Sequence, residues 1–235
     1  MPVPPARTRP AQVRVYVACS LDGFIAGPDH DLTWLPGADG ANTDGASTDA
    51  ERGATPEPHA DSPSSVRDIA APSHAAATAG DATAPAGAVG FEQFLGDVGA
   101  LLMGRGTYDV VAGFGDAWAY GDRPVLVATH RELESPRAQV RRVSGDIRDL
   151  VEAALTAAAG RDVYIDGGNL IRQALDAELI DDLILTLVPV VLGAGHALFA
   201  GSKQRHTMEF LGHHSFEGGM VQLRARPRRH AAQGP

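Results

Sequence analysis

The sequence predicts an α/β fold in which a mostly parallel central sheet is flanked by helices and ends in an antiparallel hairpin. Short β-branched segments alternate with segments whose apolar residues repeat at helical spacing, which is typical of strand–helix–strand units. Hydrophobic residues make up 44% of the 235 residues, and aromatic residues only 6%. The core must therefore consist mainly of Val, Leu, Ile and Ala, the usual residues of buried parallel strands. This length suits one domain with a sizeable core.

The first strand follows a short arm. Residues 1–12 are rich in Pro and Arg, and we predict that this arm is mobile. From Val13 the sequence alternates and is β-branched, which predicts a strand that ends near Ser20. The chain then turns and extends again before Trp34 and Leu35.

Residues 37–88 have a different composition. They are mainly Ala, Asp, Ser, Thr, Pro and Gly, contain no aromatic residue, and have Val66 and Ile69 as their only large aliphatic residues. Such a segment cannot bury enough apolar surface to offset the entropy lost on ordering. We therefore predict a disordered insertion within one domain that spans residues 13–226.

Helices and strands alternate after the insertion. Helices are predicted from Phe91, from Gly104 and from Gly168, and a further helix has Asp146 as a suitable N-cap. Strands are predicted at residues 100–103, 124–129, 140–143, 162–166 and 182–192, the last interrupted by Pro189. Residues 207–216 and 220–226 predict a closing hairpin across Gly218 and Gly219, and residues 227–235 form a tail.

The net charge of −9 is concentrated in the insertion. Residues 37–88 contain eight acidic residues and two arginines, a net charge of −6, which leaves −3 for the rest of the chain. This charge is too small to indicate nucleic acid or membrane binding through a long-range field. We expect the basic cluster of Arg224, Arg226, Arg228 and Arg229 to be a solvated tail, with a phosphate contact as the alternative.

Cysteine usage and targeting patterns restrict the protein class. Cys19 is the single cysteine, so an internal disulfide is excluded. We interpret it as a small buried hydrophobe, with a reactive thiol as the alternative. The N-terminal residues lack the apolar segment of a secretion signal, and no stretch has the length of a membrane span. We therefore expect a cytoplasmic protein.

Three predicted strands end in glycine or hydroxyl residues, at positions 103–107, 128–131 and 166–169. Ligands of open α/β sheets lie beyond the carboxyl ends of the strands, and glycine at a helix N-terminus lets backbone N–H groups approach phosphate. Together the clusters favour a phosphate-bearing ligand. Each alone has a simpler explanation: a backbone turn at Gly167 and Gly168, a surface position for Arg105, or a loop position for His130.

Other kinds of site lack their motifs. The sequence has no Gly-x-Gly-x-x-Gly after a strand, no P-loop lysine and no Gly-x-Ser-x-Gly. His196, His206, His213 and His214 have neither a helical His-x-x-x-His spacing nor a cysteine partner. We expect solvent-facing histidines and no metal site.

The order of these motifs resembles the dihydrofolate reductase superfamily, most closely the C-terminal reductase domain of bacterial riboflavin-biosynthesis enzymes. The matching segments are Ser-Leu-Asp-Gly-Phe-Ile-Ala at 20–26, Leu-Met-Gly-Arg-Gly-Thr-Tyr at 102–108, Arg-Pro-Val-Leu-Val at 123–127, Ile-Asp-Gly-Gly-Asn-Leu at 165–170, and Pro-Val-Val-Leu-Gly at 189–193 with Gly195. The resemblance covers about residues 13–36 and 89–226. It implies a dihydrofolate reductase-like fold, NADPH as cofactor and, by analogy, a homodimer.

The resemblance also implies roles for individual residues. The nicotinamide would be flanked by Ala18, Ile25 and Ala26. Arg105 would bind the 2′-phosphate, because a guanidinium can grip a phosphate with two hydrogen bonds. The other implied cofactor residues are Gly104 and Thr107 for the phosphates, Thr129 and His130 for the adenosine, and Gly167, Gly168, Asn169 and Leu170 for the pyrophosphate. Thr186 would be the threonine of the substrate pocket.

The sequence departs from the family at two points. The position of the acidic residue that folate reductases carry is here about Ala88, which argues against folate reduction. The deaminase metal motif that usually accompanies the riboflavin branch is absent. Asp22 and Glu92 are the candidate proton donors, and the alternatives are that Asp22 fixes its Asp-Gly turn and that Glu92 lies on the surface.

Three hypotheses for the function follow. The first is an NADPH-dependent reductase that transfers a hydride to a small pterin-, pyrimidine- or similar conjugated substrate. The second is a nucleotide-binding module without catalysis. In the third, residues 37–88 recruit a partner and the domain is a scaffold.

Overall fold

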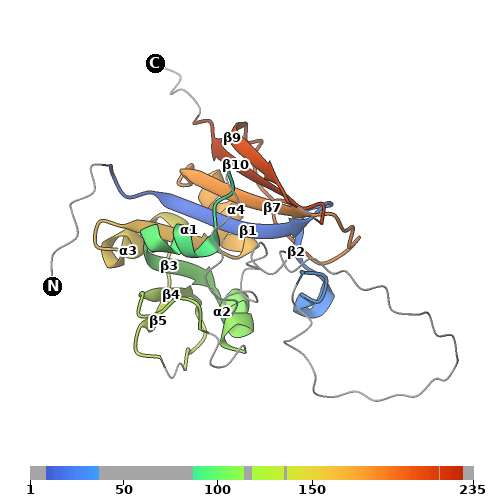
Figure 1. Cartoon of the computed structure of the whole chain (residues 1–235). Helices are drawn as coiled ribbons and strands as arrows, with labels where there is room; N and C mark the ends of the chain where they lie inside the picture. Colours follow the sequence, from blue (N-terminus) through green and yellow to red (C-terminus); the bar gives the residue numbers. More distant parts are fainter. Residues whose placement is uncertain (1–8, 37–86, 114–117, 135–136, 217, 230–235) are drawn as a thin grey trace, which may run out of the picture.

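The computed structural model describes residues 9–36, 87–113, 118–134, 137–216 and 218–229. Within these residues one large sheet forms the centre of the molecule (Figure 1). Its strands are β1 (Val13–Ser20), β3 (Val98–Gly104), β4 (Val125–Ala128), β5 (Val140–Val143), β6 (Asp162–Asp166), β7 (Asp182–Val188), β9 (Met208–Ser215) and β10 (Val221–Pro227). Their spatial order is β5-β4-β3-β6-β1-β7-β10-β9.

The pairing of the strands confirms the predicted fold class. Strands β5, β4, β3, β6, β1 and β7 pair in parallel. Strand β10 then pairs antiparallel with β7, and β9 with β10, as the predicted C-terminal hairpin requires. The carboxyl ends of the parallel strands therefore meet along one edge, where open α/β sheets bind ligands.

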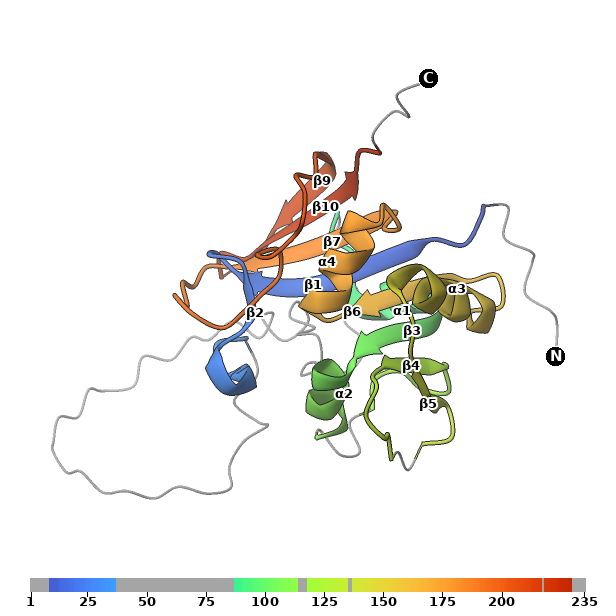
Figure 2. The ribbon, with the colours of Figure 1, turned by 180° about the vertical axis from the view of Figure 1, so that it is seen from behind.

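Helices cover both faces of the sheet. Helix α1 (Phe91–Asp97) lies in front of it in Figure 1, and α3 (Ile147–Ala157) and α4 (Gly168–Asp176) lie on the opposite face (Figure 2). One apolar cluster joins α3 and α4 to the sheet and includes Leu102, Val151 and Ile171. A second joins α1 and α2 (Arg105–Ala112) to the other face and includes Phe94, Leu101 and Tyr164.

Local sequence signals explain where several helices begin. Asp146 accepts hydrogen bonds from the backbone N–H groups of Arg148 and Asp149, so the predicted N-cap of α3 is confirmed. Helices α2 and α4 begin after Gly104 and Gly167, directly at the ends of β3 and β6. No helix in the described part of the chain is long and apolar enough to cross a membrane.

One predicted strand is shorter than expected, and a small sheet was not predicted. The strand predicted at residues 182–192 ends at Val188, directly before Pro189, which has no N–H to donate to a ladder. Strands β2 (Phe24–Ala26) and β8 (His196–Ala197) form a separate two-stranded antiparallel sheet. Their pairing links segments far apart in the sequence, which local propensity does not report.

The ends of the domain are more ordered than the sequence indicates. Arg9 contacts Asp162 at 2.6 Å, and Asp162 also accepts from the backbone N–H of Gln12 at 3.1 Å. Residues 9–12 are thus anchored, unlike the predicted mobile arm to which they belong, and residues 1–8 of that arm lie outside the described residues. Pro227 belongs to β10, so the predicted boundary at residue 226 is also too early.

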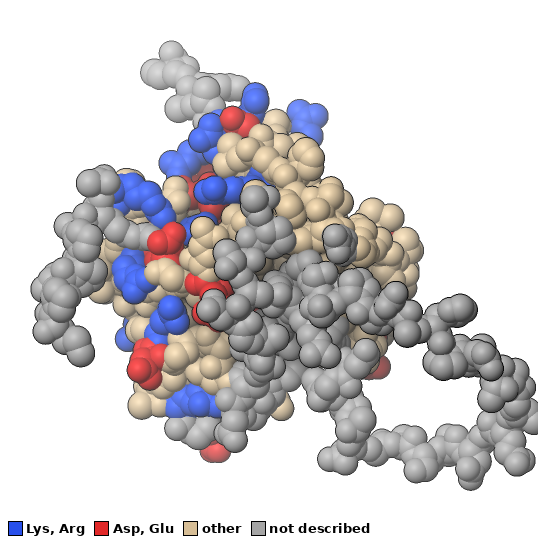
Figure 3. All heavy atoms as spheres, viewed as in Figure 1, with Lys and Arg blue, Asp and Glu red and all other residues tan. Residues whose placement is uncertain are grey.

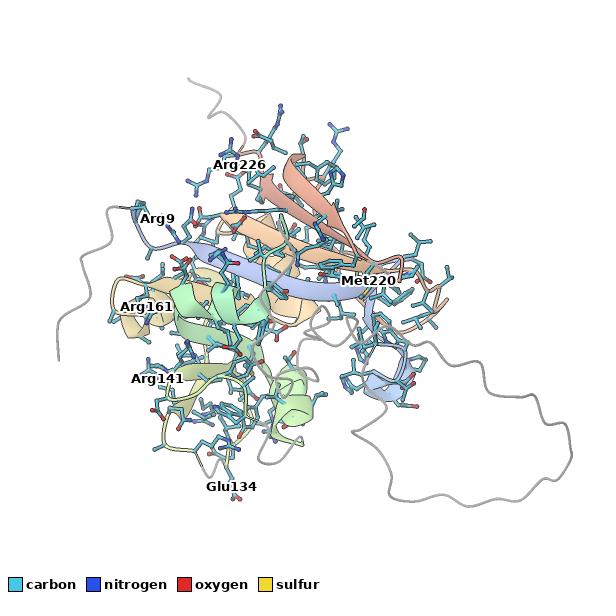
Figure 4. All side chains as sticks on the ribbon, viewed as in Figure 1. Arg9, Glu134, Arg141, Arg161, Met220 and Arg226 are labelled. Carbon is cyan, nitrogen blue, oxygen red and sulfur yellow. The ribbon has the colours of Figure 1, made fainter. Side chains whose placement is uncertain are left out.

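Three of the four C-terminal arginines are solvated, as predicted, with side chains that are 47%, 54% and 67% exposed, and each of these three is also paired with a carboxylate. Arg224 contacts Asp182, Arg226 contacts Glu209 and Arg229 contacts Asp181, each at 3.0 Å. Figure 4 shows Arg9 and Arg226 at the same end of the sheet, and Met220 at the other end. Basic and acidic side chains lie interspersed there on the face shown in Figure 3.

The predicted insertion at residues 37–88 lies outside the described residues except for Gly87 and Ala88. Ala88 is partly buried against a small apolar cluster that contains Leu35 and Met220. The folded domain therefore resumes at the end of the predicted insertion.

Candidate functional site

A cavity of about 580 Å³ opens at the carboxyl ends of β3, β4 and β6, between the starts of α2 and α4. Its walls come from four segments: the β2 region, the start of α2, the start of α4, and the β8 region. The residues that line it are Ile25, Ala26, His30, Leu32, Gly104, Arg105, Gly106, Thr107, Val110, Ala128, Asp166, Gly167, Gly168, Asn169, Leu170, Arg172, Gly195, His196, Ala197 and Ala200. The volume is in the range of small-ligand sites.

Two helix N-termini meet at this cavity. Neither Gly104, the N-cap of α2, nor Gly167, the N-cap of α4, makes a side-chain cap, so the first backbone N–H groups of both helices lack this partner. Both ends also carry the positive partial charge of the helix dipole. Two such ends at one cavity suit an anion with more than one phosphate.

Glycine is required where α4 begins. Gly167 has φ of +96°, and a Cβ there would lie 2.5 Å from Oγ1 of Thr107. A Cβ on Gly168 would lie 2.8 Å from the carbonyl oxygen of Ala197. The Gly-Gly pair therefore allows α4, α2 and β8 to approach closely around the cavity.

Arg105 lies at the start of α2 and lines the cavity. Its Nε contacts Oδ1 of Asp109 at 2.7 Å, and its Nη1 donates to the carbonyl oxygen of Glu132 at 2.8 Å. These contacts hold the guanidinium at the cavity wall. A phosphate bound there would share Arg105 with Asp109.

The β2–β8 sheet brings two histidines to the cavity. His196 of β8 is the partner of Ala26 in the ladder, and its ring stacks on His30 with a centroid distance of 4.1 Å and an interplanar angle of 9°. His30 ends the 3-10 helix η1 (Pro28–His30), which follows β2. Burial and the neighbouring His30 lower the pKa of His196, while Asp29 opposes this shift.

Most of the predicted cofactor residues line the same cavity. They are Ile25, Ala26, Gly104, Arg105, Thr107, Gly167, Gly168, Asn169 and Leu170. Ala18, Thr129 and His130 do not line it; Ala18 is 2% exposed in the apolar cluster with Leu35. The third strand-end cluster therefore contributes to the lining only through Ala128.

The structure favours the turn-fixing role for Asp22. Its carboxylate accepts hydrogen bonds from the hydroxyl of Ser20 at 2.6 Å and from the backbone N–H groups of Leu192 and Gly193 at 3.1 and 2.7 Å. These bonds, that of Ser20 foremost, lower the pKa of Asp22. Asp22 also lies outside the cavity lining, so this geometry argues against its role as the proton donor.

The other two catalytic candidates also lie outside the cavity lining. Glu92 is exposed in the first turn of α1, which fits the surface alternative. Thr186 is 2% exposed in β7, beside Ala18 in the ladder, and its Oγ1 has no hydrogen-bond partner within the described residues. A buried hydroxyl without a partner is rare. It indicates either a contact with a ligand or a local loss of folding stability.

The single cysteine lies in the core of the domain. Cys19 is 1% exposed, and burial followed by the charge of Asp22 raises the pKa of its thiol to about 12. The buried-hydrophobe interpretation is therefore favoured over the reactive thiol.

His206 is not solvent-facing as expected: its Nε2 lies 2.8 Å from Oδ1 of Asp176 and 3.1 Å from Oγ of Ser202. No group of three His, Cys, Asp or Glu residues in the described ranges could hold a metal ion.

Sequence reasoning missed several cavity residues. Arg172 follows Gly168 by one helical turn, and this spacing could have indicated that it returns to the start of α4. Its Nη1 donates to the carbonyl oxygen of Ala197 at 2.6 Å. His30 and His196 had no such signal, because the pairing of β2 with β8 alone brings them together.

The chain was compared with protein families and with curated proteins. The model of the RibD C-terminal domain matches residues 11–222. The uncharacterized protein YwjB of Bacillus subtilis is 25% identical over 210 residues, which are 89% of this chain and 94% of YwjB. The uncharacterized protein YyaP of the same organism is 27% identical over 149 residues, which are 57% of this chain and 77% of YyaP.

Solved structures share the fold. A putative riboflavin biosynthesis protein from Shewanella sp. PV-4 matches with a TM-score of 0.65 and 24% identity over 93% of this chain and 99% of that chain. RibD of Acinetobacter baumannii matches with a TM-score of 0.51 and 18% identity over 94% of this chain and 59% of that chain. The sheet, the two helix layers and the matched residues lead to one conclusion: this chain belongs to the RibD C-terminal domain family and has a dihydrofolate reductase-like fold.

Proposed function

We propose that this protein is a cytoplasmic, NADPH-dependent reductase that transfers a hydride to a small pterin-, pyrimidine- or similar conjugated substrate. Membership in the RibD C-terminal domain family supports a reductase-type activity. The observation that carries the proposal is the convergence of two helix N-termini without side-chain caps on one cavity. Such a pair of anion sites suits the two phosphates that join the halves of a dinucleotide.

The residues at the cavity fit an NADPH molecule. Gly104, Thr107 and the Gly167-Gly168 pair would bind the pyrophosphate, and Arg105 would bind the 2′-phosphate. The nicotinamide would lie against Ile25 and Ala26 and supply the hydride when bound. The role of the chain is then to orient the dinucleotide and to exclude water from the reacting carbon.

To receive a hydride, the substrate would bind in contact with the nicotinamide, and its polar edge would reach Thr186. Ala18 and Thr186 are direct partners in the β1–β7 ladder and belong to the sheet face that also carries Tyr16 and Val188. The Thr186 hydroxyl has no partner in the described residues, so a polar ring atom of a substrate would satisfy it. A pterin or pyrimidine ring offers such atoms.

A homodimer is part of this proposal. Strand β9 is the last strand of the sheet order, and it exposes Phe210 to 69% and Leu211 to 44%. An exposed edge strand presents unpaired backbone groups, which an antiparallel β9 of a second copy would satisfy around a twofold axis. The same contact would cover both apolar side chains.

The test is a calorimetric titration of NADPH and of NADH into the wild type, Arg105→Ala and Asp109→Asn. We expect the wild type to prefer NADPH and Arg105→Ala to lose this preference. Asp109→Asn removes a carboxylate that competes for Arg105, so it should bind NADPH more tightly by up to about fivefold, the value of an exposed ion pair. If neither dinucleotide bound the wild type, the reductase proposal would be wrong.

A nucleotide-binding module without catalysis is the second candidate. It is favoured by the position of Asp22, Glu92 and Thr186 outside the cavity lining. A panel of pterins and pyrimidines, with NADPH absorbance as the readout, separates the two candidates. NADPH binding without oxidation by any member of the panel would favour the module.

A further inference from the structure

We propose that His30 and His196 form a titratable clamp that closes on the diphosphate of the bound ligand, so that binding strengthens as the two imidazoles take up protons. This inference rests on the proposed function, because it concerns the same cavity. The sequence predicted a solvent-facing position for His196 and indicated no role for His30.

The two histidines lie between the starts of α2 and α4. The ring of His30 lies over the first turn of α2, since a Cβ added to Gly106 would be 3.5 Å from its Cε1. His196 stacks on His30 at 4.1 Å and is one residue from Ala197, whose carbonyl oxygen would be 2.8 Å from a Cβ on Gly168. The pair therefore bridges the starts of α2 and α4, the two places where phosphates would bind.

Positively charged groups gather at this point of the cavity. Both helix N-termini carry positive partial charge, and Arg105 and Arg172 also line the cavity. Two imidazolium rings stacked there would repel each other and the helix ends. Burial and, after it, the charge of His30 lower the pKa of His196. The contribution of His30 has the sign expected for this repulsion. A bound polyanion would remove the repulsion.

Two acidic groups near the histidines already have a partner. Asp109 contacts Arg105 from α2, and Asp166 accepts from the N–H of Gly167 at 2.7 Å at the end of β6. Asp29 of η1 is the carboxylate that acts on His196, and it favours the charged ring. The charged groups at this end of the cavity, Asp29, Arg105, Arg172 and Asp166, balance one another, so protons taken up by the two imidazoles would leave a net positive charge that a ligand diphosphate would neutralise.

Both histidines lie beside the small β2–β8 sheet. His196 belongs to β8, and His30 ends η1, which follows β2, so both are carried by segments around the small sheet that is separate from the central sheet. A contact between the clamp and a diphosphate would therefore couple ligand binding to the position of the β2–β8 sheet. Ile25 and Ala26, which would hold the nicotinamide, lie on the same small sheet or line the same wall.

The experiment measures NADP⁺ affinity from pH 5.5 to 8.5 for the wild type, His30→Gln, His196→Gln and the double variant, where the pH range brackets an ordinary imidazole pKa of about 6.5. Glutamine keeps a polar side chain that cannot become charged. His213→Gln on exposed β9 is the matched control. The 2′-phosphate of the ligand titrates in the same way with every variant, so differences between variants isolate the imidazoles. The imidazole Cε1–H signals of the wild type are followed by NMR with and without ligand.

For each imidazole that takes up a proton, we expect wild type and His213→Gln to gain up to about tenfold in affinity per unit fall in pH beyond the gain that the double variant shows. The NMR titration midpoints of His30 and His196 should move to higher pH when ligand binds. Equal pH dependence in wild type and double variant, with unmoved midpoints, would overturn the clamp while NADP⁺ binding still supported the proposed function.

A different result separates the two proposals. If the wild type bound no NADP⁺ at any pH, the proposed function would fail. The clamp would then be judged with inorganic pyrophosphate as the probe. Movement of both midpoints to higher pH with pyrophosphate would support it, and unmoved midpoints would overturn it.

Discussion

The carboxylate of Asp22 holds the backbone of Gly193 at 2.7 Å, although the two residues are 171 positions apart in sequence. The same carboxylate accepts from Leu192, so the turn after β1 is tied to the segment that follows β7. This segment leads to Gly195 and His196 in the cavity wall. Asp22 thus acts on the cavity through the backbone that it positions.

Asp22→Ala is expected to loosen residues 192–195 and to weaken dinucleotide binding without removing it. Hydrogen exchange of the Leu192 and Gly193 amides should become faster, because both lose their acceptor. Asp122→Ala, at an exposed position, is the control. Hydrogen bonds, that of Ser20 foremost, hold the pKa of Asp22 below its ordinary value. The bonds of Asp22 to Leu192 and Gly193 should therefore persist through mildly acidic pH and be lost only as pH falls through this lowered pKa. Unchanged exchange rates would contradict this role.

Arg14→Met is expected to destabilise the fold by about 3 kcal/mol. Arg14 is 5% exposed and contacts Asp182 at 2.9 Å and Asp162 at 3.4 Å, and both carboxylates are buried. Removing the cation would leave Asp182 with Arg224, and Asp162 with Arg9 and the backbone N–H of Gln12, which places the cost at the low end for a broken buried pair. Urea unfolding measures the change.

Arg226→Met is the control for this experiment. Arg226 contacts Glu209 with side chains that are 54% and 37% exposed, so its loss should cost less than about 1 kcal/mol. Equal losses of stability in the two variants would show that the buried network has no special role.

Asp176→Asn is expected to reduce stability at neutral pH and to match the wild type in strong acid. Hydrogen bonds from Ser202, Lys203 and His206, that of Ser202 foremost, lower the pKa of Asp176 to about 2. A carboxyl group with a lowered folded pKa stabilises the fold above its ordinary value of 3.8, and this contribution disappears as pH falls toward 2. Unfolding free energies of both proteins between neutral pH and pH 2 give the difference. A constant difference over this range would contradict the assignment.

Thr186→Val is expected to raise stability by about 1 kcal/mol and to weaken substrate binding. The variant removes a buried hydroxyl that has no partner in the described residues, and the side chain keeps its shape. Thermal unfolding without ligand measures the first effect, and the KM of a substrate found in the panel measures the second. Thr207→Val, just before β9, serves as the comparison. A loss of stability in Thr186→Val would mean that the hydroxyl is satisfied within the protein.

Phe210→Lys is expected to convert the proposed dimer to a monomer. The side chain is 69% exposed on the edge strand β9, so the change should not disturb the core. Light scattering after size-exclusion chromatography gives the mass. A monomeric wild type would contradict the dimer, and a dimeric variant would place the interface elsewhere.

The sequence by itself determined the order of strands and helices and the parallel character of the sheet. Most residues of Val13–Ser20 and the middle of Asp162–Asp166 are apolar, which is typical of strands that are buried on both faces, and composition is a local property of the sequence. The N-cap at Asp146 and the glycines at 104, 167 and 168 are likewise short-range signals. These signals were sufficient to find both helix N-termini of the cavity.

Only the tertiary structure decided what each polar side chain contacts. Asp22 faces Gly193 rather than a substrate, His30 stacks on His196, and Arg172 reaches the β8 backbone because distant segments fold against one another. The partner of a side chain depends on long-range packing, which local propensity and spacing do not encode. The sequence therefore located the cavity, and the structure determined which charges surround it.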